Sequence, residues 1–267
     1  MTPRGRGQLK NYRESHVGRG QDYHDKFIHG PYRSLVWELE QTRLLEILGR
    51  HPAGQSAGLR LLDFACGTGR VLQLLESRVA SSTGIDVSQS MLDVARSHLS
   101  RTELLLADIT REPVLLDRRF DLITAFRFFP NSEPALRNEV MGELVNRLSE
   151  SGILILNNHL RCEGTKMRLR LALRRFFGRG KDKVFHCMSD KEVVALVERF
   201  DLAILEEHHL AILPILKEKR PLIPKSILRW IENAAVQIPA FAPFANLKIY
   251  VLGHRTREHD EPAELRK

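Results

Sequence analysis

The sequence predicts a doubly wound α/β fold, a mainly parallel sheet with helices on both faces. Five short apolar segments alternate with segments of helical periodicity, which is the pattern of such a fold. The fifth, Gly152–His159, has the unbroken apolar run of a strand buried on both faces. Four of the five end near a polar residue, namely Asp63, Asp86, Asp108 or His159. Ligands of doubly wound folds bind outside the carboxyl ends of the strands, so these four residues mark the expected site.

The elements of the first two thirds follow in regular order. Apolar faces at helical spacing predict helices over about Tyr32–Leu48, after Gly69, after Ser88 or Ser90, and from about Pro134. The strands are expected at 61–64, Ser82–Val87, Glu103–Ile109, Phe120–Phe126 and Gly152–His159.

The last third is organised differently. Met188-Ser189-Asp190 predicts the start of a helix, Leu202–Leu213 a sixth strand and Leu247–Leu252 a final strand. Between them, Pro214–Ala245 holds five prolines and an apolar helix around Ser226–Ile238. Residues 1–20, rich in glycine and arginine, are expected to form a flexible tail. Residues 21–267 are expected to form one domain, with no internal repeat.

Composition narrows the function classes. The 267-residue chain is 43% hydrophobic, has no run of eighteen apolar residues and lacks the apolar core of a signal peptide. Its three cysteines have no metal-ligand spacing and suggest a reduced, cytoplasmic location. The formal net charge is +8, and Arg161–Lys183 alone carries nine basic residues and two acids. This density favours an anionic partner (a phosphorylated substrate, a membrane surface or nucleic acid), although a solvated basic face is the alternative.

The turn between the first strand and the next helix, Asp63-Phe64-Ala65-Cys66-Gly67-Thr68-Gly69-Arg70, suggests a nucleotide site. Glycines there let the backbone approach a ligand and expose N–H groups at a helix N-terminus. A P-loop would need Gly-Lys-Ser/Thr, which is absent. A dinucleotide fingerprint would place glycines where the chain has Ala65 and Arg70. A turn that merely connects two elements would leave the strand-end acids unexplained.

One ligand accounts for the three acids. If it carries an amino-acid end, a ribose and an adenine, Asp63 and the turn meet the amino-acid end. Asp86 accepts the ribose hydroxyls, and Asp108 accepts the adenine amino group between Met91 and Ile109.

These segments resemble the successive motifs of class I S-adenosylmethionine-dependent methyltransferases. The resemblance covers about Leu59 to Asn158 and includes Gly84-Ile-Asp-Val-Ser-x-x-Met91 and Phe120-Asp-Leu-Ile-Thr-Ala-Phe126. It implies a Rossmann-like sheet of seven strands, one of them late and antiparallel, and a reaction that turns S-adenosyl-L-methionine into S-adenosyl-L-homocysteine without a metal. Ala65 stands where the family has its first glycine. The implied cofactor-binding residues are Asp63, Ala65, Gly67, Gly69, Asp86, Val87, Met91, Asp108, Ile109, Phe126 and Arg33.

Candidate catalytic groups follow the fourth and fifth strands. His159 is the candidate general base, because its unperturbed pKa lies near neutral pH; the alternative is a structural hydrogen-bonding role. Arg127 is expected to hold an anionic substrate or, equally, to form a salt bridge at the rim. We expect transfer to an oxygen, less so a nitrogen, of a small, glycosylated or lipid-linked acceptor. An RNA methyltransferase and a non-catalytic cofactor-binding module are the alternatives.

The basic segment 161–183 and the proline-rich segment 214–245 are expected to form a cap over the crevice or a surface that contacts anionic membrane. As a helix, the basic segment would present Leu169, Ala172, Leu173 and Phe176 in one apolar stripe, with Met167 and Leu171 off it. The alternative is that the apolar residues of both segments extend the hydrophobic core and that the basic side chains are solvated.

Overall fold

The computed structural model describes residues 12–15, 20–21, 24–25, 30–51, 58–177, 187–213 and 223–255. The strands are β1 (Arg60–Phe64), β2 (Ser81–Asp86), β3 (Glu103–Leu106), β4 (Phe120–Ala125), β5 (Leu148–Asn158), β6 (Leu202–Leu210) and β7 (Leu247–His254). The α-helices are α1 (Tyr12–Ser15), α3 (Pro31–Arg50), α4 (Arg70–Leu75), α5 (Gln89–Arg96), α6 (Pro134–Val145), α7 (Thr165–Phe177), α8 (Asp190–Arg199) and α9 (Lys225–Val236). The described residues also include two 3-10 helices, η2 (Phe129–Asn131) and η3 (Pro239–Phe244).

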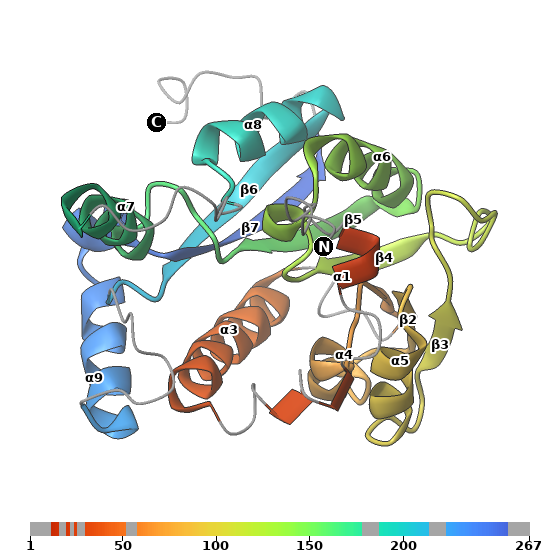
Figure 1. The fold of residues 1–267 in the computed structure, drawn as a ribbon. Coiled ribbons are helices and arrows are strands. Elements are labelled where there is room, and N and C mark those ends of the chain that lie inside the picture. Colours follow the sequence, from red (N-terminus) through yellow and green to blue (C-terminus); the bar gives the residue numbers. More distant parts are fainter. Residues whose placement is uncertain are drawn as a thin grey trace, which may run out of the picture.

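The strands form one seven-stranded sheet in the order β3-β2-β1-β4-β5-β7-β6 (Figure 1). Strands β1 to β5 pair in parallel, whereas β7 runs antiparallel to both of its neighbours, β5 and β6. The strand order reverses between β1 and β4. This is the switch point beside which doubly wound folds bind their ligands. The predicted α/β class, the seven strands and the late antiparallel strand are confirmed.

Alternation along the strands divides the interior into two cores, because successive side chains of a strand point to opposite faces. In β1, Leu61 packs into the core beneath α3, whereas Leu62 packs into the core beneath α6 and α8. The same alternation continues in β5 and in β7. Figure 1 shows α3 on one side of the sheet and α6 and α8 on the other.

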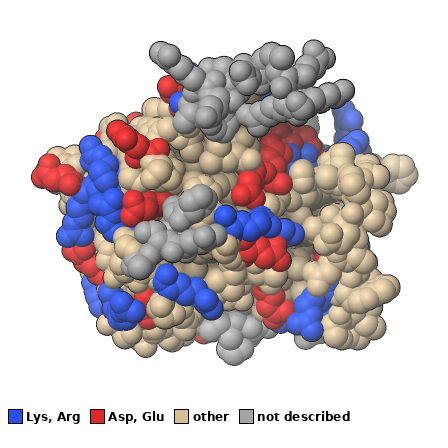
Figure 2. Space-filling view, turned by 180° about the vertical axis from the view of Figure 1, so that it is seen from behind, with Lys and Arg blue, Asp and Glu red and all other residues tan. Residues whose placement is uncertain are grey.

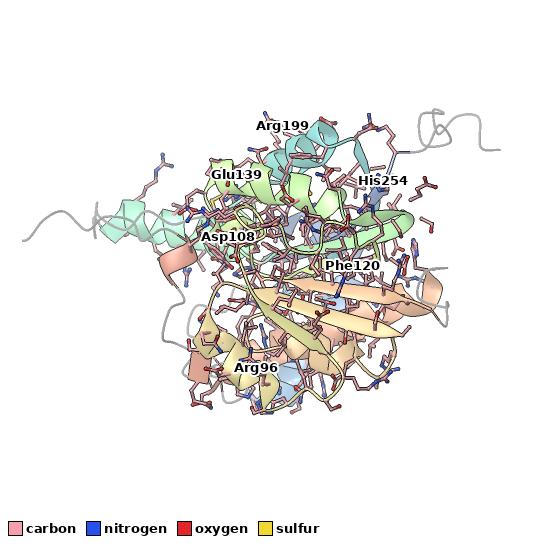
Figure 3. The ribbon with its side chains drawn as sticks, turned by 90° about the vertical axis from the view of Figure 1, so that its right-hand side faces the viewer. Arg96, Asp108, Phe120, Glu139, Arg199 and His254 are labelled. Carbon is pink, nitrogen blue, oxygen red and sulfur yellow. A yellow bond between two sulfur atoms is a disulfide. The ribbon has the colours of Figure 1, made fainter. Side chains whose placement is uncertain are left out.

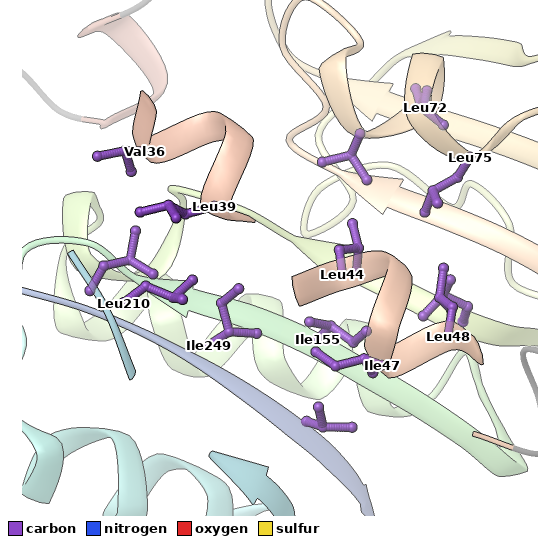
Figure 4. Packing of buried hydrophobic residues seen from close by; sticks show 14 of the residues in the cluster. Val36, Leu39, Leu44, Ile47, Leu48, Leu72, Leu75, Ile155, Leu210 and Ile249 are labelled. Atoms are coloured by element: carbon purple, nitrogen blue, oxygen red, sulfur yellow. The ribbon is translucent and has the colours of Figure 1, made fainter. Parts of the chain in front are cut away.

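Helix α3 supplies the centre of the first core (Figure 4). Its residues Leu44 and Ile47 are fully buried against the sheet, where Ile155 and Ile249 lie. Full burial of one such aliphatic side chain contributes about 1.5–3 kcal/mol. Pro31 in the first turn suits a helix start, where the N–H group that proline lacks has no intrahelical partner. This packing fixes α3 beside the carboxyl end of β1.

Helix α8 confirms a local prediction. The Ser189 hydroxyl accepts a hydrogen bond from the Glu192 N–H at 3.2 Å, and the Glu192 carboxylate accepts one from the Ser189 N–H at 2.8 Å. This reciprocal capping satisfies two backbone donors that a helix start leaves without partners.

Several predicted boundaries differ from the structure, among them the start of β5, which is Leu148 rather than Gly152, and three others that bear on the site. Strand β3 ends at Leu106, so Asp108 lies in the loop after it. Strand β6 ends at Leu210 rather than at Leu213, because Ala211 adopts a left-handed backbone with φ of 55°. Residues 12–15, placed in a flexible tail by the sequence, form α1; the rest of 1–19 lies outside the described residues.

The helices of the expected cap, α7 and α9, lie with η3 at one end of the molecule, on the left of Figure 1. Residues 178–186 and 214–222 of the expected cap segments lie outside the described part of the chain. Leu169, Leu173 and Phe176 of the predicted stripe of α7 are exposed, whereas Met167, predicted to lie off the stripe, is buried. Within the described residues no helix is both long and apolar enough to cross a bilayer.

Candidate functional site

The turn after β1 has an unusual backbone that only small residues accept easily. Ala65, Gly67 and Gly69 have positive φ angles of 52°, 55° and 75°. A Cβ atom on Gly69 would approach Leu99 Cδ1 at 3.0 Å, so glycine is needed there for space as well as conformation. Alanine at 65 tolerates this backbone at a cost of order 1 kcal/mol. The turn places Arg70 at the start of α4 and directs its amides toward the strand ends.

Asp86, at the end of β2, is oriented by the same turn. Its Oδ2 accepts a hydrogen bond from the Gly67 N–H at 2.8 Å, and its Oδ1 accepts one from the Ser88 N–H at 2.9 Å. Bonds from two backbone amides fix the plane of this carboxylate without long, flexible partners. Asp86 is therefore a rigid acceptor at the sheet edge, as its predicted role requires.

Asp63, at the end of β1, is a buried acid. Its side chain is 2% exposed, and its Oδ1 accepts a hydrogen bond from Thr124 Oγ1 at 2.7 Å. Burial raises the pKa of Asp63 to about 7, against the opposing influence of the Thr124 bond and Arg70. A carboxyl that titrates near neutrality at the mouth of a crevice is typical of a functional group.

A cavity of about 470 Å³ opens between the ends of β1, β2, β4 and β5. Small-molecule sites commonly have volumes of roughly 300–1,000 Å³. Every predicted site residue except Gly69 lines it; these are His159, Arg127, Asp63, Ala65, Gly67, Asp86, Val87, Met91, Asp108, Ile109, Phe126 and Arg33. Gly69 does not line the cavity; its left-handed backbone lets the turn lead into α4. Lining residues that we did not predict include Tyr12, Arg13, Lys166, Arg170 and Asn246.

Asp108 has hydrogen-bond partners that we did not predict from the sequence. Its Oδ2 accepts a hydrogen bond from Arg13 Nε at 2.6 Å, and its Oδ1 accepts bonds from the Thr110 amide and hydroxyl. Burial raises the pKa of Asp108, but the bonds from Arg13 and Thr110 outweigh it and leave that pKa below its usual value. The expected bond to an adenine amino group must therefore share the carboxylate with Arg13.

Helix α1 closes this end of the cavity. Tyr12 donates its N–H to Glu133 Oε1 at 3.0 Å, and its ring meets the Phe128 ring edge-on at a centroid distance of 4.9 Å. Asp108 and Glu139, both partners of Arg13, lie next to α1 in Figure 3. Four residues are too few for a periodic pattern, so no signal in the sequence could have found this contact.

Arg127 follows β4 and has the salt bridge that the sequence offered as one alternative. Its Nη2 donates to Glu40 Oε2 at 3.0 Å, and Glu40 is fully buried in α3. Asn157 joins the pair: its Nδ2 donates to Glu40 Oε1 at 2.6 Å, and its Oδ1 accepts from the Arg127 N–H. The network holds Arg127 at a φ of 64°. Arg127 is thus a wall residue whose charge is compensated, which weakens the expectation that it binds substrate.

His159 follows β5 and faces the same cavity. Its Nδ1 is buried and has no hydrogen-bond partner among the described residues. Burial lowers the pKa of His159 well below its usual value, and the nearby positive charges of Arg127, Lys166, Arg33 and Arg70 lower it further. The ring is therefore neutral at pH 7, with a nitrogen available to a ligand.

The cysteines are arranged in a way that their spacing did not predict. Cys162 and Cys187 form a disulfide across 25 residues, and Cys66 is a buried free thiol in the turn after β1.

Among the described residues, no group of three or more histidine, cysteine or acidic side chains is placed to hold a metal ion.

Part of the chain matches a known protein family by sequence. Residues 61–152 match the methyltransferase domain family. The chain is 44% identical over 82 residues to trans-aconitate 2-methyltransferase of Delftia acidovorans, covering 30% of each protein. It is 34% identical over 99 residues to demethylmenaquinone methyltransferase of Thermotoga maritima, covering 36% of this chain and 42% of that one. The aligned part thus spans less than half the length of these curated relatives.

Solved structures share the fold over nearly the whole chain. The magnesium protoporphyrin IX methyltransferase of Synechocystis PCC 6803, solved with S-adenosylhomocysteine, superposes with a TM-score of 0.59 at 12% identity and covers 91% of this chain and 97% of that one. The PH0226 protein of Pyrococcus horikoshii superposes with a TM-score of 0.56 at 18% identity, covering 88% and 99%. The domain match over residues 61–152 and the shared strand order thus show a methyltransferase-like segment within a fold that solved S-adenosylmethionine-dependent methyltransferases also have.

Proposed function

We propose that this protein binds S-adenosyl-L-methionine and transfers its methyl group to an acidic oxygen of an acceptor. The observation that carries the proposal is one cavity lined by the strand-end acids Asp63 and Asp86, by the turn after β1 and by His159. When bound, the cofactor supplies a sulfonium-activated methyl group, so the reaction needs no metal.

The residues of the chain fit this cofactor. Asp86, held by two backbone amides, is a pre-oriented acceptor for ribose hydroxyls. Met91 and Ile109 are buried apolar residues on the cavity wall and suit the faces of an adenine ring. Asp63 offers a negative charge to the cationic amino-acid end, and Arg33 a positive charge to its carboxylate. One curated relative is named the ubiquinone biosynthesis O-methyltransferase of Coxiella burnetii, which supports transfer to an oxygen.

The positive charge around His159 selects the acceptor. The cations that lower the pKa of His159 also lower the pKa of any hydroxyl or carboxyl group placed beside it. They favour an acceptor whose oxygen ionises readily, such as a phenol or a carboxylic acid, and disfavour a cationic amine. A neutral His159 then accepts the hydrogen bond, or the proton, that a phenolic acceptor brings. Lys166 and Arg170 extend this positive lining toward α7.

Two measurements test the proposal in order. Calorimetry with S-adenosylhomocysteine tests the cofactor site: Asp86→Ala should weaken binding by at least a hundredfold, whereas the control Asp93→Ala, an exposed acid on α5, should not change it. Equal binding by Asp86→Ala would remove the ribose assignment.

Transfer of tritiated methyl groups tests the reaction itself. Phenolic and carboxylic acceptors, amines and RNA would be offered to the intact protein, and label is expected in the acidic oxygen acceptors. If the protein binds the cofactor tightly but transfers no methyl group to these acceptors or to any fraction of a cell extract, it is instead a module that only binds the cofactor. Label in RNA or in an amine would contradict the acceptor class.

A further inference from the structure

Exposed apolar side chains are concentrated at one end of the molecule. Among the described residues, ten of the fourteen large apolar side chains that are exposed belong to α7, η3, α9 or the residues directly flanking α9. Trp230 is 72% exposed, and Leu171 and Ile227 are each 49% exposed. A concentration of exposed apolar side chains on neighbouring elements marks an interaction site, because their contact with water is unfavourable. We call the exposed surface of α7, η3 and α9 the docking face.

Buried hydrogen bonds hold parts of the docking face together. Arg161 Nη1 donates to the carbonyl oxygens of Pro243 and Ala245, both at 2.9 Å, just before α7 begins. Asn246 Oδ1 accepts the Lys166 N–H at 2.6 Å, which ties the first turn of α7 to the end of η3. Figure 1 shows α7, η3 and α9 on the same side of the sheet's β6–β7 end. The apolar side chains are therefore presented by a fixed platform.

The charge of the docking face is positive. Helix α7 carries five basic residues and no acid. The single acid of α9, Glu232, is fully buried, and its carboxylate accepts hydrogen bonds from the Ile212 and Leu213 amides inside the protein. The back of the molecule differs, because acidic and basic side chains are interspersed over its left and central parts (Figure 2). A partner of the docking face must therefore be both apolar and anionic.

We propose that the docking face binds the surface of an anionic lipid bilayer. Leucine, isoleucine and tryptophan side chains enter the boundary between head groups and acyl chains, and arginines such as Arg168 and Arg175 pair with lipid phosphates. Nucleic acid would pair with the arginines but would leave Leu171, Ile227 and Trp230 in water, so the observations favour lipid. Because Lys166 and Arg170 of α7 also line the cavity, docking brings the cavity close to the head groups.

Vesicle flotation tests the proposal without any acceptor or cofactor. The full chain should float with vesicles of phosphatidylglycerol and phosphatidylcholine, and at least tenfold less with phosphatidylcholine alone. Trp230→Glu and, separately, Arg168→Glu with Arg175→Glu should each reduce flotation at least tenfold. Leu116→Glu is the matched control, since Leu116 is 54% exposed outside the docking face, and it should float like the parent.

Fluorescence identifies the surface that meets the lipid. The chain has two tryptophans, Trp37 in α3 and Trp230 in α9. Anionic vesicles should shift the emission of the parent to shorter wavelength, and Trp230→Phe should abolish the shift while binding S-adenosylhomocysteine like the parent. Circular dichroism checks that each variant is folded.

Three outcomes would overturn the proposal: no flotation with anionic vesicles, flotation that Trp230→Glu and Leu116→Glu reduce equally, or salt-sensitive RNA binding in place of vesicle binding. The cofactor affinity of Asp86→Ala tests the proposed function alone, because flotation with vesicles requires no cofactor.

Discussion

The hydroxyl of Thr124 donates a hydrogen bond of 2.7 Å to Asp63 Oδ1, and the two residues face each other in the pairing of β1 with β4. The bond lies at the point where the strand order reverses. It holds a carboxyl group that is 2% exposed and whose pKa is raised by burial to about 7. Folding therefore places an acid with a pKa near 7 where a cationic ligand is expected. Both cofactor affinity and protein stability should therefore depend on pH through Asp63.

Cofactor affinity should depend on pH through Asp63. Above pH 7 the carboxylate is charged and attracts the ammonium group of S-adenosylhomocysteine. At lower pH the ligand must displace a proton, so its dissociation constant should rise about tenfold between pH 8 and pH 6. Calorimetry across this range measures it. In Asp63→Asn the profile should be flat over the same range; an unchanged pH dependence in that variant would assign the titration to another group.

The same acid should lower the stability of the ligand-free protein at high pH. The pKa of Asp63 rises from 3.8 to about 7 on folding, so its contribution to stability is full below pH 4 and lost as the pH rises through 7. Asp63→Asn should therefore raise the free energy of unfolding at pH 8, by on the order of 2–4 kcal/mol, and less at pH 5. Urea denaturation at both values measures this. A variant less stable than the parent at pH 8 would contradict the argument.

His159→Ala should abolish methyl transfer and leave cofactor affinity intact. The ring lines the cavity and carries a buried Nδ1 without a hydrogen-bond partner among the described residues, while the proposed cofactor contacts, the turn and Asp86, belong to other elements. We expect kcat to fall at least a hundredfold, the usual contribution of a positioned acid or base. Because the pKa of His159 is well below its usual value, kcat of the parent should show no titration of this ring above pH 7. The control His98→Ala, on the loop after α5, should retain activity; near-normal turnover of His159→Ala would exclude a catalytic role.

The disulfide between Cys162 and Cys187 should stabilise the segment that contains α7. It closes a loop of 25 residues, and a cross-link of this length contributes about 3 kcal/mol by restricting the unfolded chain. A reducing agent, or Cys162→Ser with Cys187→Ser, should therefore lower the free energy of unfolding. Cys66→Ala, which removes the buried free thiol, should keep the response to reductant. Alkylation of three cysteines in the unfolded, unreduced protein would refute the pairing.

Local patterns were sufficient to predict the frame of the fold. Apolar strands that alternate with amphipathic helices gave the α/β class, because these periodicities depend only on residues near one another in the sequence. The left-handed turn at Gly67 and Gly69, and the capped helix at Ser189, were predictable for the same reason. Boundaries failed where backbone conformation intervened, as at Ala211.

The partners of the site residues were not predictable, because they come from distant parts of the chain. Arg13 reaches Asp108 across 95 residues, and Glu40 reaches Arg127 across 87. An isolated arginine or glutamate in a sequence looks the same whether it is solvated or buried in an ion pair. The apolar residues of α7 show the same limit, since their spacing did not indicate that Met167 is buried while Leu169 and Leu173 are exposed.

The sequence by itself determined the sheet, the glycine turn and the acids at the strand ends, because these follow from periodicity and from residue type at a fixed offset. Only the tertiary structure decided how charged those acids are and what they touch. Burial against β4 raises the pKa of Asp63, while Arg13 lowers that of Asp108. Desolvation and ion pairing depend on the three-dimensional surroundings of a group, and no local pattern encodes them.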